Sequence, residues 1–211
     1  MKIQSFLTIG LLALAARAGA DTCSVPSIAY PTIQAAVDDT TCTTINVAPG
    51  VYAENVTIPR ALVLNGSQAG VPIAGRVSAG PAESVIIGAN PVGPNAVITI
   101  NASNVTVDGF TISNPVTVNT AIGIQVKPVA TFTTITNNFL DGINSADPGP
   151  AGSAAGIFVE GGAFSSFLTS NALRNISGSQ SVHGFLLGDG NPANLLSPLT
   201  IQHNIISGIT S

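Results

Sequence analysis

The sequence predicts an all-β fold, a right-handed parallel β-helix with a short N-terminal capping helix. The first indication is a repeat in which an aliphatic residue, two variable residues, Asn, one variable residue and another aliphatic residue recur. Its copies centre on Asn138, Asn171 and Asn204, which follow one another at intervals of 33 residues. Self-similarity at a period of this length is typical of a solenoid. The second indication is composition, because only 8% of the residues are charged and 5% are aromatic. A right-handed coil is expected because crossovers between parallel strands almost always have that hand.

A second marker divides the repeat more finely. Gly, an aliphatic residue or Phe, a variable residue and another aliphatic residue begin at Gly123, Gly156 and Gly184. An earlier copy of the first pattern has Phe110 in the Asn position, so the spacing to Asn138 gives a basic coil of 28 residues (138 − 110). Coils of 33 residues therefore contain insertions of five residues.

We expect these insertions in two loops, 144–153 and 188–197. Insertions on a solenoid emerge as surface loops and often line its binding face. Asp147, Asp189 and Asn191 in these loops are therefore candidate binding residues. The second loop could offer oxygen atoms to Ca²⁺, but it does not match a calcium-loop spacing. Neither a metal site nor a cofactor is predicted.

The repeat also predicts which side chains form the interior. Each corner Asn is expected to adopt the left-handed conformation and to stack on the Asn of the next coil in a hydrogen-bonded ladder. The aliphatic residues on either side should face the interior, and this set includes Val107, Ile112, Ile135, Leu140, Leu168, Leu173, Ile201 and Ile206.

Residues 1–20 have the pattern of a secretory signal peptide. Lys2 precedes the apolar stretch 6–16, and the small residues 18–20 form a cleavage site before Asp21. The stretch could instead remain as an uncleaved anchor, but eleven residues (6–16) are too few to cross a bilayer. The chain is therefore expected to be secreted, to the extracellular space, the cell surface or a periplasm, with no membrane span.

The start of the mature chain predicts the capping structure. Residues 31–39 read as a helix that Thr32 can cap, with an apolar stripe on one side. Cys23 and Cys42 are the only two cysteines, and a disulfide is expected in an exported chain. This bond would hold the helix over the first coil.

The mature residues 21–211 are expected to form one domain. Residues 21–66 would form the N-terminal cap and first coil, and residues 97–211 the repeat coils. Short apolar segments between Gly, Pro and Asn residues predict strands at 44–47, 62–64, 85–87, 97–100 and 105–107.

Three segments carry a family resemblance. Thr32–Val37, Ile45–Ile58 and Leu62–Gly66 resemble the opening of pectin-lyase-like right-handed parallel β-helix proteins, among them pectin methylesterases. The resemblance implies the fold and, for the enzymes of this family, activity on polysaccharides. The Asp-Phe-Ile-Phe-Gly-like strand of the methylesterases is not found, and of the polygalacturonase signatures only His183-Gly184 is a fragment. The family's catalytic motifs therefore do not carry over to this chain.

The 33-residue spacing also pairs charged residues of successive coils. Lys127 should stack on Glu160, and Asp141 on Arg174, as structural ion pairs about 4.8 Å apart. Asp108 is the carboxylate without a charged partner at equivalent positions. If the chain has catalytic residues, the candidates are Asp108, Asp141 and Arg174.

Charge limits the partners. After removal of residues 1–20, four basic residues face ten acidic ones, a net charge of −6 (6 − 2 − 10). Nucleic-acid binding, which needs clustered Lys and Arg, is therefore not expected. The leading hypothesis is an extracellular structural, adhesive or carbohydrate-binding module that contacts a polysaccharide or a cell-surface component. The alternative is a polysaccharide lyase, hydrolase or esterase with diverged or missing catalytic residues.

The last repeat, residues 199–209, is as regular as the earlier ones, and the sequence stops two residues later. An apolar edge of a parallel stack is a template for another strand. The C-terminal edge is therefore expected to dock further coils or another copy of the chain.

Overall fold

The computed structural model describes residues 21–90, 92, 96–163, 165–188 and 198–211. The expected signal peptide lies outside these residues, as do the candidate binding residues Asp189 and Asn191.

The described strands form three sheets in which all neighbours are parallel, here named sheets A, B and C. Sheet A has seven described strands: β1 (Asp21–Val25), β2 (Cys42–Val47), β5 (Leu62–Asn65), β8 (Val105–Asp108), β11 (Thr134–Thr136), β14 (Ser166–Thr169) and β17 (Leu199–Gln202). Sheet B has six: β3 (Gly50–Ala53), β6 (Ser84–Ile87), β9 (Phe110–Val116), β12 (Phe139–Ser145), β15 (Ala172–Ser177) and β18 (Ile205–Thr210). Sheet C has five: β4 (Val56–Ile58), β7 (Ala96–Ile100), β10 (Ala121–Val126), β13 (Ala154–Val159) and β16 (Val182–Leu187).

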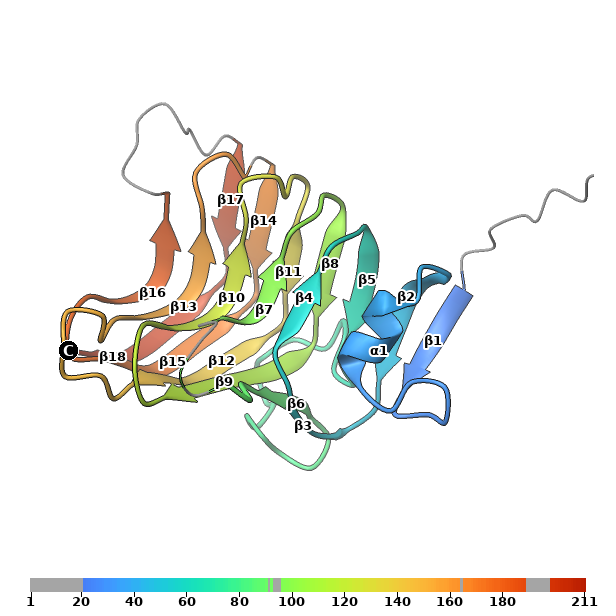
Figure 1. Ribbon diagram of the computed structural model, residues 1–211, viewed down its shortest axis with the longest axis horizontal. Coiled ribbons are helices and arrows are strands. Elements are labelled where there is room, and N and C mark those ends of the chain that lie inside the picture. Colours follow the sequence, from blue (N-terminus) through green and yellow to red (C-terminus); the bar gives the residue numbers. More distant parts are fainter. Residues whose placement is uncertain (1–20, 91, 93–95, 164, 189–197) are drawn as a thin grey trace, which may run out of the picture.

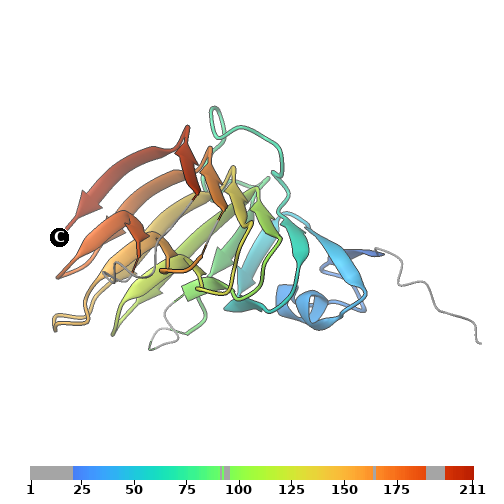
Figure 2. The ribbon, with the colours of Figure 1, turned by 90° about the horizontal axis from the view of Figure 1, so that it is seen from above.

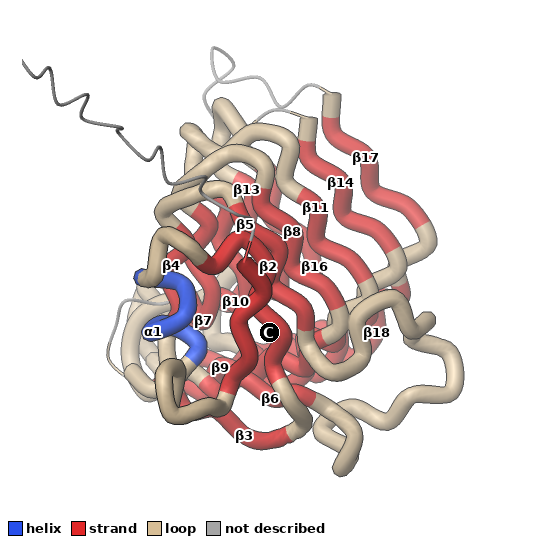
Figure 3. Tube along the Cα trace, turned by 90° about the vertical axis from the view of Figure 1, so that its right-hand side faces the viewer, coloured by secondary structure: helices blue, strands red, loops and turns tan. Residues whose placement is uncertain are grey.

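From β2 onward the chain visits sheets A, B and C in turn and then returns to sheet A beside its previous strand. Successive coils therefore lie side by side, as Figures 1 and 2 show, and the three sheets surround a common interior (Figure 3). The expected all-β solenoid of parallel strands is confirmed. Its right-handed sense remains a prediction.

The interior is a stack of aliphatic side chains. Six of the eight predicted interior residues are fully buried, namely Val107, Ile112, Ile135, Leu140, Leu168 and Leu173. The prediction was wrong for Ile201 and Ile206, which are 38% and 52% exposed. Both pair in the predicted register with Leu168 and Leu173. In the described residues, however, β17 and β18 have a neighbouring strand on one side only, so one side of each side chain stays uncovered.

The predicted Asn ladder joins sheets A and B. Asn138 and Asn171 are both fully buried. The Asn171 Oδ1 accepts hydrogen bonds from the backbone N–H and from the side-chain amide of Asn138, both at 3.1 Å. Asn204 accepts the same pair from Asn171, at 2.8 and 3.1 Å. Phe110, which occupies the Asn position in the earlier coil, donates its backbone N–H to the Asn138 Oδ1 at 2.9 Å.

The left-handed backbone conformation occurs one residue before each ladder Asn. The prediction that the ladder Asn residues themselves adopt this conformation was therefore wrong. Positive φ angles occur at Gly109, Asn137, Ser170 and His203. The ladder Asn lies between this corner and the next strand, and from there its side chain reaches the neighbouring coil.

The insertion predicted in loop 144–153 is divided between two places. Leu140 pairs with Ile112, a difference of 28, whereas Ser145 pairs with Val116, a difference of 29. One inserted residue therefore forms a bulge in β12, where Gly142 has a φ of 77°. The other four lie between β12 and β13, because Ala154 pairs with Ala121, a difference of 33.

Helix α1 (Ile33–Asp38) lies at the N-terminal end of the solenoid (Figure 1). Thr32 accepts a hydrogen bond from the Ala35 backbone N–H, and the Glu54 carboxylate accepts those of Ile33 and Gln34, both at 3.0 Å. At the other end of the helix the Arg60 guanidinium donates to three backbone carbonyls. The helix is thus held at both ends by side chains, and its apolar face is formed by the buried residues Ile33, Ala36 and Val37.

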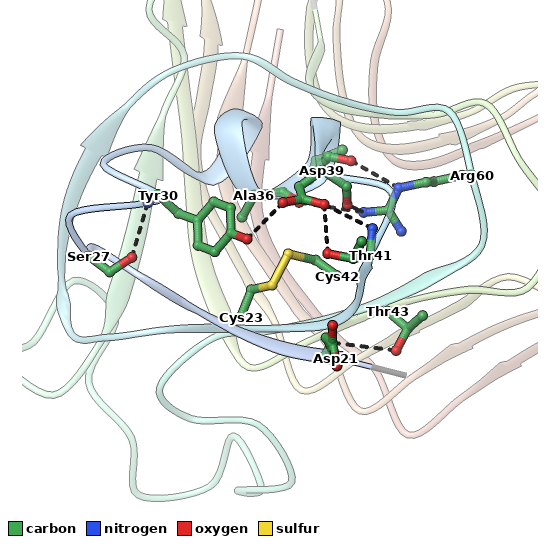
Figure 4. The surroundings of a disulfide bond; sticks show 11 residues. Asp21, Cys23, Ser27, Tyr30, Ala36, Asp39, Thr41, Cys42, Thr43 and Arg60 are labelled. Carbon is green, nitrogen blue, oxygen red and sulfur yellow. Dashed lines mark hydrogen bonds between the residues drawn. A yellow bond between two sulfur atoms is a disulfide. The ribbon is translucent and has the colours of Figure 1, made fainter. Parts of the chain in front are cut away.

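The expected disulfide between Cys23 and Cys42 is present. It joins the adjacent strands β1 and β2 beside the helix (Figure 4). Near the disulfide, the Tyr30 hydroxyl donates a hydrogen bond to the Asp39 carboxylate at 2.8 Å (Figure 4). This hydrogen bond raises the pKa of Tyr30.

Candidate functional site

The outer face of sheet C carries a groove of about 490 Å³ across β10, β13 and β16. Three rows of side chains line it. The first row consists of hydroxyl residues just before the strands, and the second and third consist of residues within them. Ala154, a member of the core cluster, also borders the groove. The lining residues are Thr120, Ser153, Ser181, Ile122, Ala154, Ala155, His183, Phe158 and Leu186.

The register of the strands aligns these rows along the solenoid. Ile122 pairs with Ala155, which pairs with His183. Phe158 pairs with Leu186 in the neighbouring coil. Between these two rows in β13, Ile157 is fully buried, and a Cβ atom at Gly156 would meet the interior side chain of Leu173, so both intervening residues face the core. The groove is therefore a consequence of the repeat, with similar positions offered by successive coils.

The glycine marker has a packing role behind this groove. A Cβ atom at Gly123 would lie 2.7 Å from the Leu140 side chain, and one at Gly156 would lie 2.8 Å from the Leu173 side chain. Sheet C thus approaches the interior residues of sheet B so closely that only glycine fits at these positions. This close approach explains the marker that recurs in the sequence.

The lining is apolar with a polar border. Phe158, Ile122 and Leu186 offer apolar surface, whereas the three hydroxyls and the His183 imidazole can donate or accept hydrogen bonds. Among the described residues that line the groove, none is Asp, Glu, Lys or Arg. Apolar walls with a few convergent polar groups are typical of sites for small or extended neutral ligands.

The described residues contain no group of three or more His, Cys, Asp or Glu side chains that could hold a metal ion. In the same part of the chain, no helix is long and apolar enough to cross a membrane.

The side chain of the candidate binding residue Asp147 is used in hydrogen bonds within the protein. Its carboxylate accepts hydrogen bonds from the backbone N–H groups of Asn119 and Gly149, both at 2.7 Å. These two bonds lower the pKa of the Asp147 carboxyl. A separate hollow of about 460 Å³ lies beside it. The carboxylate thus joins two successive turns between sheets B and C.

One long segment, 66–83, links β5 to β6 (Figure 1). Of the three candidate catalytic residues, Asp108 is hydrogen-bonded to this segment and Asp141 lies near it. At one end, the Asp108 carboxylate accepts the Gly70 backbone N–H at 3.0 Å. It also accepts a hydrogen bond from the Asn137 side-chain amide at 2.9 Å. Its two partners thus come from the 66–83 segment and from the next coil. Asp108 is therefore anchored to this segment and to the sheet corner.

Asp141 and Arg174 form the predicted ion pair, with the Arg174 Nε 3.0 Å from the Asp141 Oδ2. Asn175 donates to the other carboxylate oxygen at 2.7 Å. Partial burial by itself would raise the pKa of the Asp141 carboxyl. The Ser78 hydroxyl, the Asn175 amide and the Arg174 charge outweigh that effect, and the pKa is lowered. Ser78 belongs to the 66–83 segment, and its buried hydroxyl lies near Asp141 without a hydrogen-bond partner among the described residues.

Sequence reasoning missed the buried ion pair of this segment. The Arg76 Nη2 lies 2.7 Å from the Glu83 Oε2, and the two side chains are 5% and 3% exposed. Arg76 also donates to the Asn137 carbonyl at 2.6 Å. The Phe139 ring lies between two guanidinium groups, with Arg76 5.1 Å and Arg174 4.8 Å from its centroid. The signal in the sequence was one Arg and one Glu in an unusually long link between two strands.

The segment also contributes to a small buried apolar cluster. Ile73 packs with Phe139 and Ala172 as a separate buried cluster outside the main interior. The segment is thus fastened to sheet B by apolar packing and by the Thr111 hydroxyl, which donates to the Glu83 carboxylate at 3.2 Å. It is also held at the sheet corner by the hydrogen bonds of Arg76 with the Asn137 carbonyl and of Gly70 with Asp108. The structure therefore brings Asp141 and Arg174 together. Asp108 does not join them and instead bonds to Gly70, near the start of the 66–83 segment.

The second predicted pair, Lys127 and Glu160, is also present, with 2.7 Å between the Nζ and Oε1 atoms. Gln125 donates to the same carboxylate oxygen at 2.6 Å. These residues lie at the C-terminal ends of β10 and β13, on the side opposite the hydroxyl row of the groove.

The fold and the groove define the class of the molecule as a β-helix-like solenoid of three parallel sheets. A comparison with protein-family models, curated proteins and solved structures finds no match.

Proposed function

We propose that the chain is a secreted carbohydrate-binding β-helix module, and that the groove on sheet C is its binding site. The observation that carries the proposal is the combination of an apolar surface around Phe158 with a row of hydroxyls. The C–H faces of sugar rings pack on aromatic and aliphatic side chains, and sugar hydroxyls exchange hydrogen bonds with Ser, Thr and His.

The charge of the groove favours a neutral glycan. Its described lining residues carry no Lys or Arg that could pair with a uronate carboxylate. The mature chain is acidic, with a net charge of −6 (6 − 2 − 10). A polyanion would therefore be repelled at long range and would find no counter-charge on contact.

The N-terminal region supports export and a protected first coil. A disulfide persists in oxidising compartments, which agrees with the secretory signal that the sequence suggests for residues 1–20. Helix α1 packs against β1, β2 and β4 and would act as the cap of the solenoid. A right-handed coil and a pectin-lyase-like ancestry belong to the same proposal, supported by the opening segments 32–37, 45–58 and 62–66.

The test is a binding screen on immobilised neutral and acidic polysaccharides, followed by titration of the strongest neutral ligand. Phe158→Ala should weaken that binding about tenfold or more, since loss of an aromatic contact of about 1.4 kcal/mol corresponds to a factor of ten. The matched control is Phe167→Ala, because Phe167 is an aromatic residue 44% exposed on sheet A, away from the groove.

Unchanged circular dichroism and melting temperature of both variants would exclude unfolding as the cause. Equal affinity of Phe158→Ala and Phe167→Ala for every bound glycan would refute the assignment of the groove.

The alternative of a polysaccharide lyase, hydrolase or esterase rests on Asp108, Asp141 and Arg174. Incubation with pectin, alginate and neutral polymers, with assays for uronide release and ester cleavage, tests it. Turnover that disappears in Asp141→Asn while that variant stays folded would favour the enzyme over the binding module.

A further inference from the structure

The chain contains five Asn-x-Ser/Thr sequences, at Asn55, Asn65, Asn101, Asn104 and Asn175. In a secretory pathway with an oligosaccharyltransferase, such a sequence is an acceptor for an N-linked glycan. The side-chain nitrogen forms a bond to C1 of a sugar and loses a proton, while the bond from that carbon to a lipid diphosphate breaks. The lipid diphosphate leaves. A modified Asn keeps one N–H and must have open space for a bulky, hydrated chain.

Three of the five side chains are already used by the fold. Asn55 donates from its amide to the Ala96 carbonyl at 2.8 Å, and its Oδ1 accepts the backbone N–H groups of Ala89 and Asn90, both at 3.0 Å. It thereby fastens the link between β6 and β7 to the start of β4. The remaining N–H of a modified Asn55 could still reach the Ala96 carbonyl, but the residue is half-buried and a bulky glycan would have to displace the chain around it.

Asn65 and Asn175 are joined to neighbouring coils. Asn65 donates to the Asn46 Oδ1 at 3.1 Å and lies in sheet A between Asn46 and Asp108. With strands about 4.8 Å apart on both sides, a first sugar there would collide with side chains of the adjacent rungs. Asn175 donates to the Asp141 carboxylate at 2.7 Å, beside Arg174, and thereby supports the ion pair near the 66–83 segment.

Asn101 and Asn104 differ in their hydrogen bonding. Both side chains are exposed, as that of Asn175 is too, but within the described residues neither of their side-chain amides has a hydrogen-bond partner. Their backbone N–H groups hold the turn, donating to the carbonyls of Ile58 and Thr131 at 2.9 Å. The turn is therefore fixed by its backbone while both amides point to solvent.

We propose that the turn 101–104, between β7 and β8, is the N-glycan acceptor of this chain and that the other three sequences stay bare in the folded protein. Two large glycans three residues apart would crowd each other, so one glycan per molecule is expected. The turn follows the C-terminal end of a sheet C strand, whereas the hydroxyl row of the groove precedes such strands. A glycan there leaves the groove open, so this proposal stands or fails independently of carbohydrate binding.

The experiment is secretion of the full chain from a eukaryotic host, followed by peptide mapping with and without a peptide-N-glycosidase, which converts each glycan-bearing Asn to Asp. We expect conversion at Asn101 or Asn104 alone. The double variant Asn101→Gln/Asn104→Gln should be secreted at the mass of the bare chain, with no mass change on enzyme treatment.

The matched control is Thr57→Ala, which removes the acceptor sequence at Asn55 without touching the Asn55 amide and should keep the glycan unchanged. Conversion at Asn55, Asn65 or Asn175 in folded secreted protein would overturn the proposal. So would a wild-type chain that is secreted without any glycan, or a double variant that still loses mass.

Discussion

Replacement of Asn171 by Ala should remove one rung of the ladder that joins sheets A and B. The Asn171 side chain is fully buried and makes four side-chain hydrogen bonds. Its Oδ1 accepts two from Asn138, and its amide donates to the Ile135 carbonyl at 2.9 Å and to the Asn204 Oδ1 at 3.1 Å. The most serious loss is the partner of the Asn138 backbone N–H, which no water can reach in the intact coil.

A buried polar group left without a partner costs about 1–3 kcal/mol, and this substitution leaves the Asn138 N–H in that condition. The Ile135 carbonyl loses the bond from the Asn171 amide but stays in the parallel ladder of β11 and β14. We therefore expect the free energy of unfolding to fall by about 2–4 kcal/mol. Because native domains are stable by only about 5–15 kcal/mol, the change should be large in an equilibrium measurement. Urea unfolding followed by circular dichroism, with the disulfide intact, measures it from the shift of the midpoint at constant slope.

The matched control is Asn46→Ala. Asn46 is an exposed Asn on sheet A whose side chain accepts one hydrogen bond, from Asn65 at 3.1 Å. Its loss should change the free energy of unfolding by at most about 1 kcal/mol. If Asn171→Ala and Asn46→Ala lower it equally, the ladder does not stabilise the solenoid in the way described.

Glu83→Gln leaves the Arg76 side chain, 5% exposed, without its anion and should lower the free energy of unfolding by about 3–5 kcal/mol. The double variant Arg76→Met/Glu83→Gln should recover at least half of that loss in urea unfolding, and no recovery would contradict the assigned pairing. Replacement of both Cys23 and Cys42 by Ser should remove about 3 kcal/mol, the chain-entropy value for a loop closed across a separation of 19 residues. Two free thiols in the mass spectrum of the non-reduced wild type would exclude the bond. Two backbone N–H groups lower the pKa of the Asp147 carboxyl. The ionised carboxyl therefore contributes its full stabilisation above its unfolded pKa of about 3.9, and this contribution disappears as the pH falls through the lower pKa of the folded state. Stability should therefore decline as the pH falls below about 4, and Asp147→Asn should make that decline less steep. An unchanged slope would show that the Asp147 carboxylate does not keep these two hydrogen bonds in solution.

Much of the solenoid could be predicted because its contacts repeat. In a stack of parallel strands, residues one coil apart in the sequence become neighbours in space, so the 33-residue spacing identified both the Asn ladder and the pairs Lys127–Glu160 and Asp141–Arg174. The disulfide followed from the number of cysteines and the expected compartment.

Only the tertiary structure decided what does not repeat. The 66–83 segment occurs once, and its contacts join distant positions, such as Arg76 and Asn137, which are 61 residues apart and meet through a guanidinium and a backbone carbonyl. No periodicity marks such a contact, because a carbonyl has no signature in the sequence. The position of the left-handed corner, one residue before each ladder Asn, depends on how the backbone leaves sheet A.

The groove on sheet C differs from that segment, because its lining positions do repeat. The Gly marker already places Ile122 and His183 at one equivalent position and Phe158 and Leu186 at another. That these two rows line one groove appears only in the structure. The sequence by itself thus determined the length of the repeat, most of the interior residues and the residue pairs that stack between successive coils. The shape of the outer surface was decided by the turns and by the long segment, because their conformations depend on contacts that each occur only once.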